Sequence, residues 1–129
     1  MNGRYLLDTN AVIALFENET RLLERLATAS ETFVPTIALG ELYFGAAKSR
    51  QATENAARID QFAARSSVLG CDASVAREYG RIKNRLRETG RPLPENDIWI
   101  AATARHYGLA LVTRDRHFRE VEGLELQIW

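Results

Sequence analysis

Apolar residues in this chain gather in short runs, separated by longer segments in which they recur every three to four positions. The short runs lack the alternation of a half-exposed strand, which is typical of buried strands in a parallel sheet. The longer segments place their apolar residues along one side, as amphipathic helices do. We therefore predict strands at Arg4–Thr9, Thr32–Val34, Ser67–Cys71, Leu109–Thr113 and Glu125–Ile128.

Helices are expected between these strands, and the residues at their ends support this reading. Asn10 and Asp72 are good helix N-caps, while Gly90 and Gly108 are suited to the left-handed position after a helix. The predicted helices are Asn10–Phe16, Glu19–Ala29, Thr36–Lys48, Gln51–Arg65, Asp72–Thr89 and Glu95–Tyr107. Alternating strands and helices predict an α/β fold, a three-layer α/β/α sandwich with a mostly parallel sheet of four to five strands.

Length and composition limit the class of protein. The chain has 129 residues without a repeat or a low-complexity linker, so we expect residues 1–129 to form one domain with its own core. Its 17 basic and 17 acidic side chains exclude a globally cationic nucleic-acid binder but allow a local basic rim. The uncharged runs are far shorter than the roughly 18 residues that a membrane helix needs.

The single cysteine points to a cellular compartment. Cys71 has no second cysteine with which to form an internal disulfide, which fits a reducing cytoplasm. We expect a soluble, cytoplasmic protein. Cys71 ends a predicted strand, so we expect it to be a small buried residue of the core rather than a nucleophile.

Four carboxylates lie in or beside stretches that are too apolar to favour a charge. Asp8 is the only charged residue in YLLDTNAVIALF, and Glu41 is the only one in TIALGELYFGAA. Asp97 precedes the uncharged run IWIAATA, and Asp115 follows LALVT after a single arginine. A buried carboxylate is costly unless it is paired or bound to a cation. Four such residues indicate one shared cation.

The predicted fold brings these acids towards one edge of the sheet. Asp8 and Asp115 follow strands directly, Glu41 lies one turn into the helix after the second strand, and Asp97 begins a helix. Two carboxylates about 4 Å apart repel by roughly 4 kcal/mol at an effective dielectric near 20, so a cation is needed to hold four together. Oxygen ligands select Mg²⁺, with Mn²⁺ as a substitute, and such an ion suits phosphodiester hydrolysis.

Each acid also has a structural explanation. Asp8 is a possible helix cap, Asp97 another beside Asn96, and Asp115 a possible start of a turn. Glu41 is hardest to explain in this way, because its helix contains no opposite charge with which it could pair.

The order of these motifs resembles that of the PIN-domain nucleases, and most closely the VapC-type toxins of bacterial toxin–antitoxin pairs. The resemblance extends over essentially the whole chain. It rests on Asp8-Thr9-Asn10, on Glu41 in an apolar helix, on Asn96-Asp97 followed by Ile100-Ala101-Ala102-Thr103-Ala104, and on Thr113-Arg114-Asp115 followed by His117-Phe118. It implies an α/β/α sandwich and a Mg²⁺- or Mn²⁺-dependent endoribonuclease. It further implies an RNA substrate and a homodimer that a cognate antitoxin inhibits.

The resemblance also assigns roles to residues. Asp8 and Asp97 match the principal metal ligands of the family, and Glu41 and Asp115 match its other two catalytic acids. Three neighbouring polar residues match positions beside these acids. Thr9 and Asn10 are expected to orient the first carboxylate, and Thr113 to place a hydroxyl near the fourth.

Other residues near the acids admit two readings. Arg114, Arg116 and His117 surround Asp115 and either steer an RNA backbone or form a solvated turn with local ion pairs. For His117 we expect a structural hydrogen bond rather than metal ligation.

The apolar surface leaves a choice as well. Residues such as Leu15, Tyr43 and Phe44 exceed what one small sheet needs, so some are expected at a dimer contact or a groove for a partner. The alternative to an enzyme is a non-catalytic PIN-like scaffold that binds protein or RNA.

Overall fold

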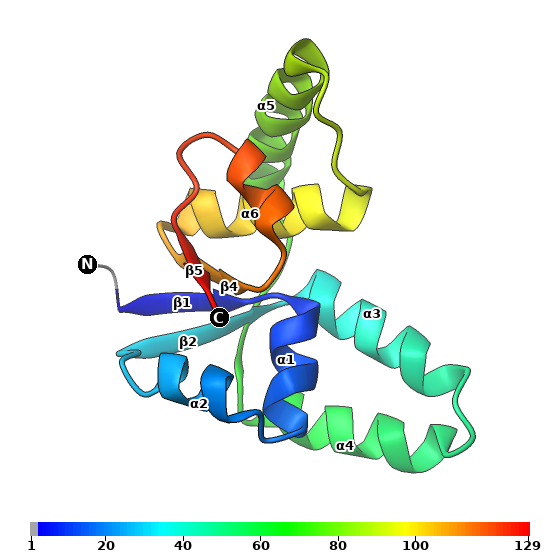
Figure 1. Cartoon of the computed structure of the whole chain (residues 1–129). Coiled ribbons are helices and arrows are strands. Elements are labelled where there is room, and N and C mark those ends of the chain that lie inside the picture. Colours follow the sequence, from blue (N-terminus) through cyan, green and yellow to red (C-terminus); the bar gives the residue numbers. More distant parts are fainter. Residues whose placement is uncertain (1–2) are drawn as a thin grey trace.

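Five parallel strands form one sheet in the order β3-β2-β1-β4-β5 in the computed structural model, which describes residues 3–129. The central strand β1 lies between β2 and β4 (Figure 1). The strands are β1 (Arg4–Leu7), β2 (Glu31–Pro35), β3 (Ser67–Leu69), β4 (Ala110–Thr113) and β5 (Leu126–Ile128). The prediction of a parallel sheet is confirmed.

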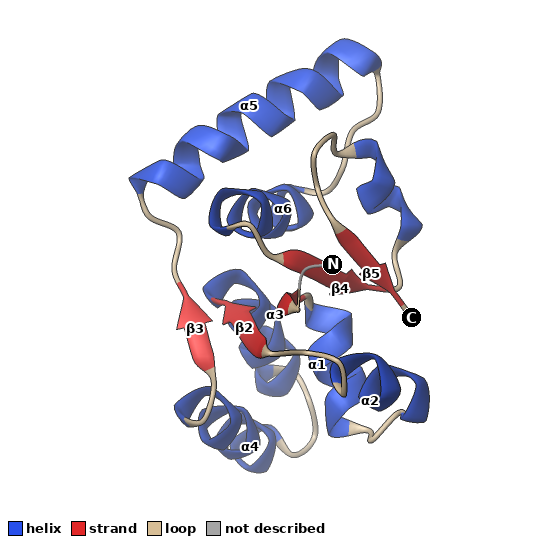
Figure 2. Cartoon of the chain, turned by 90° about the vertical axis from the view of Figure 1, so that its left-hand side faces the viewer, coloured by secondary structure: helices blue, strands red, loops and turns tan. Residues whose placement is uncertain are grey.

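Helices cover both faces of this sheet, as Figures 1 and 2 show from two directions. One layer contains α1 (Thr9–Phe16), α2 (Thr20–Leu26), α3 (Thr36–Ala47) and α4 (Ala52–Ala64). The other contains α5 (Ala73–Thr89) and α6 (Glu95–Tyr107). The expected three-layer sandwich is confirmed. A short 3₁₀ helix, η1 (Arg116–Glu120), follows β4 and was not predicted.

Alternate residues of the central strands pack into separate cores on the two faces. Tyr5 and Leu7 of β1 pack in the core of α1–α4, whereas Leu6 packs with Leu111 in the core of α5 and α6. All four are buried, which explains why these strands read as uninterrupted apolar runs. Burying one such side chain contributes about 1.5–3 kcal/mol. The rigid centre of the sheet therefore supports the residues that follow β1 and β4.

Helix ends agree with the sequence in several places and differ in others; the second helix, for example, ends at Leu26 rather than Ala29. Gly90 and Gly108 have φ of 67° and 66°, the left-handed conformation expected after a helix, and the Asp72 carboxylate accepts the Val75 amide at 2.9 Å. The prediction of Asn10 as the cap of the first helix is wrong. Asp8 caps α1 instead, because β1 ends at Leu7 and leaves Asp8 extended, with Asn10 already inside the helix.

Cys71 is exposed, so the prediction that it is a core residue is wrong. β3 lies at the edge of the sheet and ends at Leu69, and the chain has left the core by residue 71. An exposed position there does not require an apolar side chain.

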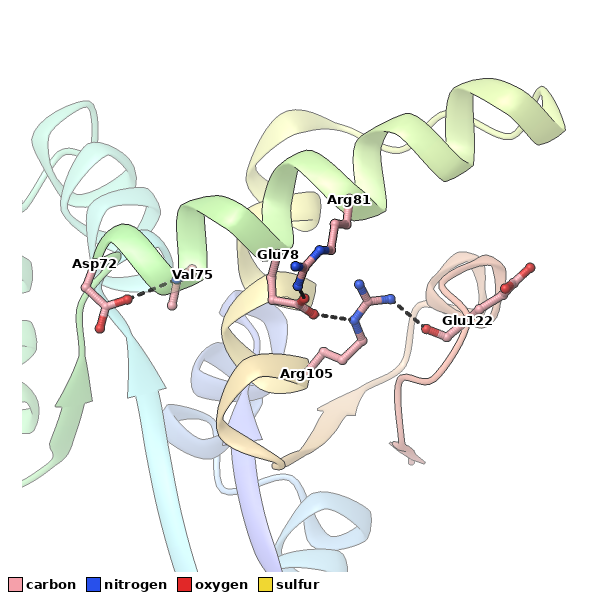
Figure 3. A network of polar contacts seen from close by, with 6 residues as sticks. All are labelled: Asp72, Val75, Glu78, Arg81, Arg105 and Glu122. Carbon is pink, nitrogen blue, oxygen red and sulfur yellow. Dashed lines mark hydrogen bonds and ion pairs between the residues drawn. The ribbon is translucent and has the colours of Figure 1, made fainter.

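A polar network fixes α5 and α6 against each other and against the chain that precedes β5 (Figure 3). Arg105 of α6 donates to Glu78 of α5 at 2.6 Å and to the Glu122 carbonyl at 2.9 Å, and Arg81 also donates to Glu78 at 2.9 Å. Glu78 is mostly buried, so its charge-assisted hydrogen bonds hold α6 firmly in place. Of the helices in residues 3–129, none is long and apolar enough to cross a membrane.

Candidate active site

The direction in which successive strands are added to the sheet reverses between the neighbouring strands β1 and β4. β2 and β3 extend the sheet to one side of β1, and β4 and β5 extend it to the other. In open α/β sheets, sites form beyond the carboxyl ends of strands at this reversal. Asp8 directly follows β1, and Asp115 lies two residues beyond Thr113, the last residue of β4. Two of the four predicted acids therefore lie at the position that this topology favours.

Asp8 is a buried carboxylate held by two hydrogen bonds. Asp8 is only 5% exposed, and its Oδ1 accepts a hydrogen bond from the Ala11 amide at 2.8 Å. Burial raises the pKa of Asp8 to about 6, although hydrogen bonds from Thr113 and Ala11 act in the opposite direction. The nearby charges of Asp97 and Asp115 raise it further. Asp8 is thus both the cap of α1 and a charge that burial disfavours.

Thr113 links two of the acids. It is fully buried at the end of β4, its hydroxyl hydrogen-bonds Asp8, and its Oγ1 accepts the Asp115 amide at 3.0 Å. Because one hydroxyl contacts both segments, the carboxyl ends of β1 and β4 are fixed relative to each other.

Asp97 lies in the first turn of α6 and is partly buried. Burial raises its pKa to about 6, and the charges of Asp115 and Glu41 raise it too, while His117 lowers it. The explanation of Asp97 as a helix cap is wrong. The cap position is Pro94, and no side chain of residues 3–129 caps this helix.

Glu41 projects from α3 and is only partly exposed. Its Oε1 accepts the Thr9 hydroxyl at 2.6 Å, across 32 positions of sequence. Thr9 therefore positions Glu41, whereas the resemblance led us to expect that Thr9 orients Asp8. Asn10 is exposed and makes no hydrogen bond to Asp8 within residues 3–129.

Asp115 is positioned by the start of η1. Its Oδ1 accepts the His117 amide at 2.9 Å and lies 2.9 Å from Nδ1 of the same histidine. The structural hydrogen bond expected for His117 is confirmed, and so is the reading of Asp115 as the start of a turn. The charge of Asp115 also raises the pKa values of Asp8 and Asp97.

The four acids form one electrostatic cluster. The charges of Asp97 and Asp115 raise the pKa of Asp8, and the charges of Asp115 and Glu41 raise the pKa of Asp97. No lysine or arginine in residues 3–129 forms an ion pair with any of the four, which leaves His117 as the one basic contact. Separate neutralisation by arginines is therefore excluded for this part of the chain. The negative charge is instead available to a cation from outside.

The donor set fits a hard divalent cation. The four acids offer eight carboxylate oxygens, and the cluster contains no cysteine and no histidine besides His117. Such a set suits Mg²⁺ or Mn²⁺ rather than zinc. Among residues 3–129, no three Asp, Glu, His or Cys side chains stand in the arrangement of a formed cation site. Repulsion between neighbouring carboxylates keeps such groups apart.

The basic residues beside Asp115 differ in their surroundings. Arg114 donates to Glu19 at 2.5 Å, and its guanidinium lies 4.7 Å from the ring centroid of Trp129. This ion pair joins Arg114 to a residue 95 positions earlier in the chain rather than to a neighbour within the turn. Arg116 and His117 are exposed next to the acids.

The chain matches the PIN domain family over residues 5–124. It belongs to the PIN-domain family. This PIN domain is 39% identical over 131 residues to Ribonuclease VapC2 of Haemophilus influenzae, with 98% of each chain covered. It is 36% identical over 129 residues to the tRNA(fMet)-specific endonuclease VapC of Shigella flexneri, again with 98% of each covered.

Solved structures agree with this assignment. The PIN domain is similar to a chain in the crystal structure of DNA-bound VapBC from Salmonella typhimurium. The TM-score is 0.89 at 31% identity, and 100% of this chain and 99% of that chain are covered. Within the PIN-domain family, the chain belongs to the VapC group.

Proposed function

We propose that this PIN domain is a Mg²⁺- or Mn²⁺-dependent endoribonuclease and the toxin of a type II toxin–antitoxin pair. One observation carries the proposal: the charges of four carboxylates beside the ends of β1 and β4 affect one another, and none of the four pairs with a lysine or arginine of residues 3–129. Buried acids with raised pKa values in such a position are characteristic of functional sites. The similarity to VapC ribonucleases supports RNA as the substrate.

Asp8 and Asp97 are the residues that would hold the cation, with Glu41 and Asp115 binding it directly or through water. When bound, Mg²⁺ or Mn²⁺ supplies positive charge for the phosphate oxygens and makes a bound water more acidic.

The chain's own contribution is to orient these carboxylates. Asp8 is fixed by the Ala11 amide and Thr113, Glu41 by Thr9, and Asp115 by the His117 amide. The Thr9 bond occupies Oε1 of Glu41 and leaves Oε2 without a partner in residues 3–129. We assign to this oxygen the role of accepting a proton from the water that attacks the phosphorus. The phosphodiester bond to the leaving oxygen then breaks, and that oxygen takes up a proton from solvent.

The partners follow from the family. We propose a homodimer, located in the cytoplasm with its RNA substrate, that a cognate antitoxin inhibits. Similar chains occur in solved VapBC toxin–antitoxin complexes, including one with promoter DNA from Rickettsia felis. Relatives from Shigella flexneri and Salmonella typhimurium are named tRNA(fMet)-specific endonucleases, which makes tRNA(fMet) the first substrate to assay.

The deciding experiment measures RNA cleavage by the purified protein with Mg²⁺ or Mn²⁺, and again with excess chelator. We expect cleavage by the wild type only with metal, and a loss of at least 100-fold in Asp97→Asn. Asp72→Asn is the matched control, because Asp72 is an exposed aspartate outside the cluster. Cleavage that survives chelation or Asp97→Asn would refute the proposal. RNA binding without cleavage, and without stabilisation by Mn²⁺, would instead support the scaffold alternative.

The toxin role has a separate test. Induced expression in a bacterial host should arrest growth with the wild type and not with Asp97→Asn at equal protein level. Growth that continues with an active wild-type nuclease would remove the toxin assignment alone.

A further inference from the structure

A groove of about 670 Å³ runs along α3 and includes Glu41, one of the four acids. It is lined by one residue of α1, one of α6 and one side of α3, chiefly Thr9, Asn96, Gly40, Glu41, Phe44 and Lys48. Glu41 belongs both to this groove and to the acid cluster, and Asn96 precedes Asp97. A ligand in the groove therefore lies next to the reacting phosphate of the proposed nuclease.

Phe44 presents an uncovered aromatic ring in this groove. It is 66% exposed, the highest value among the large apolar residues that the structure exposes. The buried side of α3 consists of Ala38, Leu39, Leu42 and Ala46, so Phe44 is not needed in the core. Leaving such a ring in water forfeits a sizeable hydrophobic contribution.

A cation accompanies the ring. Lys48, which directly follows α3, places its Nζ 4.8 Å from the ring centroid of Phe44. An aromatic face beside a lysine is the combination with which proteins hold single-stranded nucleic acid, because the ring stacks on a base and the ammonium binds the phosphate.

The backbone of α3 is bare on either side of Phe44. A Cβ at Gly40 or Gly45 would meet no atom within 4 Å, so packing does not require glycine at either position. Glycine within a helix costs roughly 0.5–1 kcal/mol relative to alanine. Gly40 and Gly45 both line the groove, so neither position places a side chain in it.

We infer that this groove binds one nucleotide of single-stranded RNA adjacent to the scissile phosphate. The base stacks on Phe44, the neighbouring phosphate binds Lys48, and the Asn96 amide lies within the same groove to contact the base edge or the ribose. The inference rests on the proposed function, since it names the part of that substrate that the protein holds outside the acid cluster.

The groove suits RNA better than a second copy of the chain. Besides Phe44, the exposed large apolar residues in the described part of the chain are Ile13, Leu23 and Val68, and none of them lines the groove. A protein interface usually has an apolar core of several residues. One ring beside one ammonium matches a single base and phosphate.

The test combines kinetics and binding. Cleavage of a single-stranded RNA is measured with Mn²⁺, and affinity for the same labelled RNA is measured in the Asp97→Asn background. Phe44→Leu should raise KM and weaken binding about tenfold with kcat unchanged, within the range that stacking contributes per base. Phe44→Trp should retain binding. Leu23→Ala, which alters an exposed apolar residue outside the groove, is the matched control and should change neither value.

The role of Lys48 is tested separately, through the salt dependence of RNA binding. Lys48→Gln should weaken binding and reduce the slope of log affinity against log salt by about 0.7, the amount for one phosphate contact on a single strand. Lys48→Arg should preserve both. Unchanged slope and affinity in Lys48→Gln would overturn the phosphate contact.

The outcomes separate this inference from the nuclease itself. A wild type that does not cleave RNA refutes the proposed function first. A wild type that cleaves, together with unchanged KM and affinity in Phe44→Leu, overturns the groove alone. Weaker self-association of Phe44→Leu in sedimentation, with RNA binding intact, assigns the groove to a second copy and also overturns the inference.

Discussion

Replacing Asp8 with asparagine should stabilise the metal-free protein at alkaline pH, although Asp8 caps a helix. The substitution removes a buried charge and retains the Oδ1 atom that accepts the Ala11 amide at 2.8 Å. The Thr113 hydroxyl loses its charged acceptor. Two opposing effects therefore decide the result.

The structure provides the size of each effect. Burial raises the pKa of Asp8 from 3.8 to about 6, which corresponds to about 3 kcal/mol of destabilisation when the carboxylate is ionised. Weakening the hydrogen bond to Thr113 costs about 1 kcal/mol. The net gain for Asp8→Asn at pH 8 is about 2 kcal/mol. For a domain of this length, that gain raises the melting temperature by about 8 °C.

The direction with pH follows from the raised pKa. Folding favours the protonated form of Asp8, so the carboxyl group is not destabilising below its unfolded pKa of 3.8 and becomes so as pH rises through about 6. The advantage of Asp8→Asn should therefore shrink between pH 7 and pH 4. At pH 4 the lost hydrogen bond is the larger effect, and the variant should be equal to the wild type or slightly less stable.

Urea unfolding in excess chelator at pH 8, 6 and 4 measures this difference. Asp72→Asn is the matched control, because Asp72 caps α5 through the same kind of bond to Val75 but lies in water. That bond, and then Tyr107, lower the pKa of Asp72, so its asparagine variant should lose stability at pH 8. If Asp8→Asn is less stable than the wild type at pH 8, or its effect is independent of pH, the argument from burial is wrong.

Three further predictions test the site and the fold. Mn²⁺ should raise the melting temperature of the wild type more at pH 8 than at pH 5, since protons compete for Asp8 and Asp97, whose pKa values are both about 6; equal shifts would contradict this. Thr113→Val should lower the free energy of unfolding in urea by about 1–2 kcal/mol, because the partly buried Asp115 amide and Asp8 both lose a partner, and an unchanged value would show that the bridge is unimportant. Gly108→Ala should cost about 1 kcal/mol in thermal unfolding through its left-handed φ of 66°, while Gly80→Ala, in the middle of α5 with no atom within 4 Å of the new Cβ, should not destabilise the protein; equal effects would contradict the argument from φ.

The order of strands and helices could be predicted because each central strand is buried on both faces. Leu6 and Leu111 face one core and Tyr5 the other, so β1 and β4 contain no polar alternation that would suggest an exposed sheet. The ends of elements were less certain. Asp8 and Asn10 are equally good caps in sequence, and only the end of β1 at Leu7 decides between them.

Contacts between distant segments could not be predicted from local patterns. Thr9 and Glu41 are 32 positions apart, and nothing in either segment indicates that the hydroxyl bonds Glu41 rather than its neighbour Asp8. The exposure of Phe44 was equally hidden. α3 is apolar almost all round, so periodicity does not tell which of its residues the core leaves out. The acids themselves were visible because a lone charge in an apolar segment needs a reason.

The same burial that makes Asp8 costly also makes the site selective for an external cation. An arginine paired with Asp8 or Asp97 would neutralise it permanently, and no arginine or lysine in residues 3–129 forms such an ion pair. The rigid centre of the sheet, formed by Leu6 and Leu111, holds the carboxyl ends of β1 and β4 together despite the repulsion. The uncompensated charge of Asp8 destabilises the metal-free protein but favours the binding of a cation. A cation that binds only the folded state then stabilises that state. For this reason a variant that removes the charge is expected to be more stable and inactive at once.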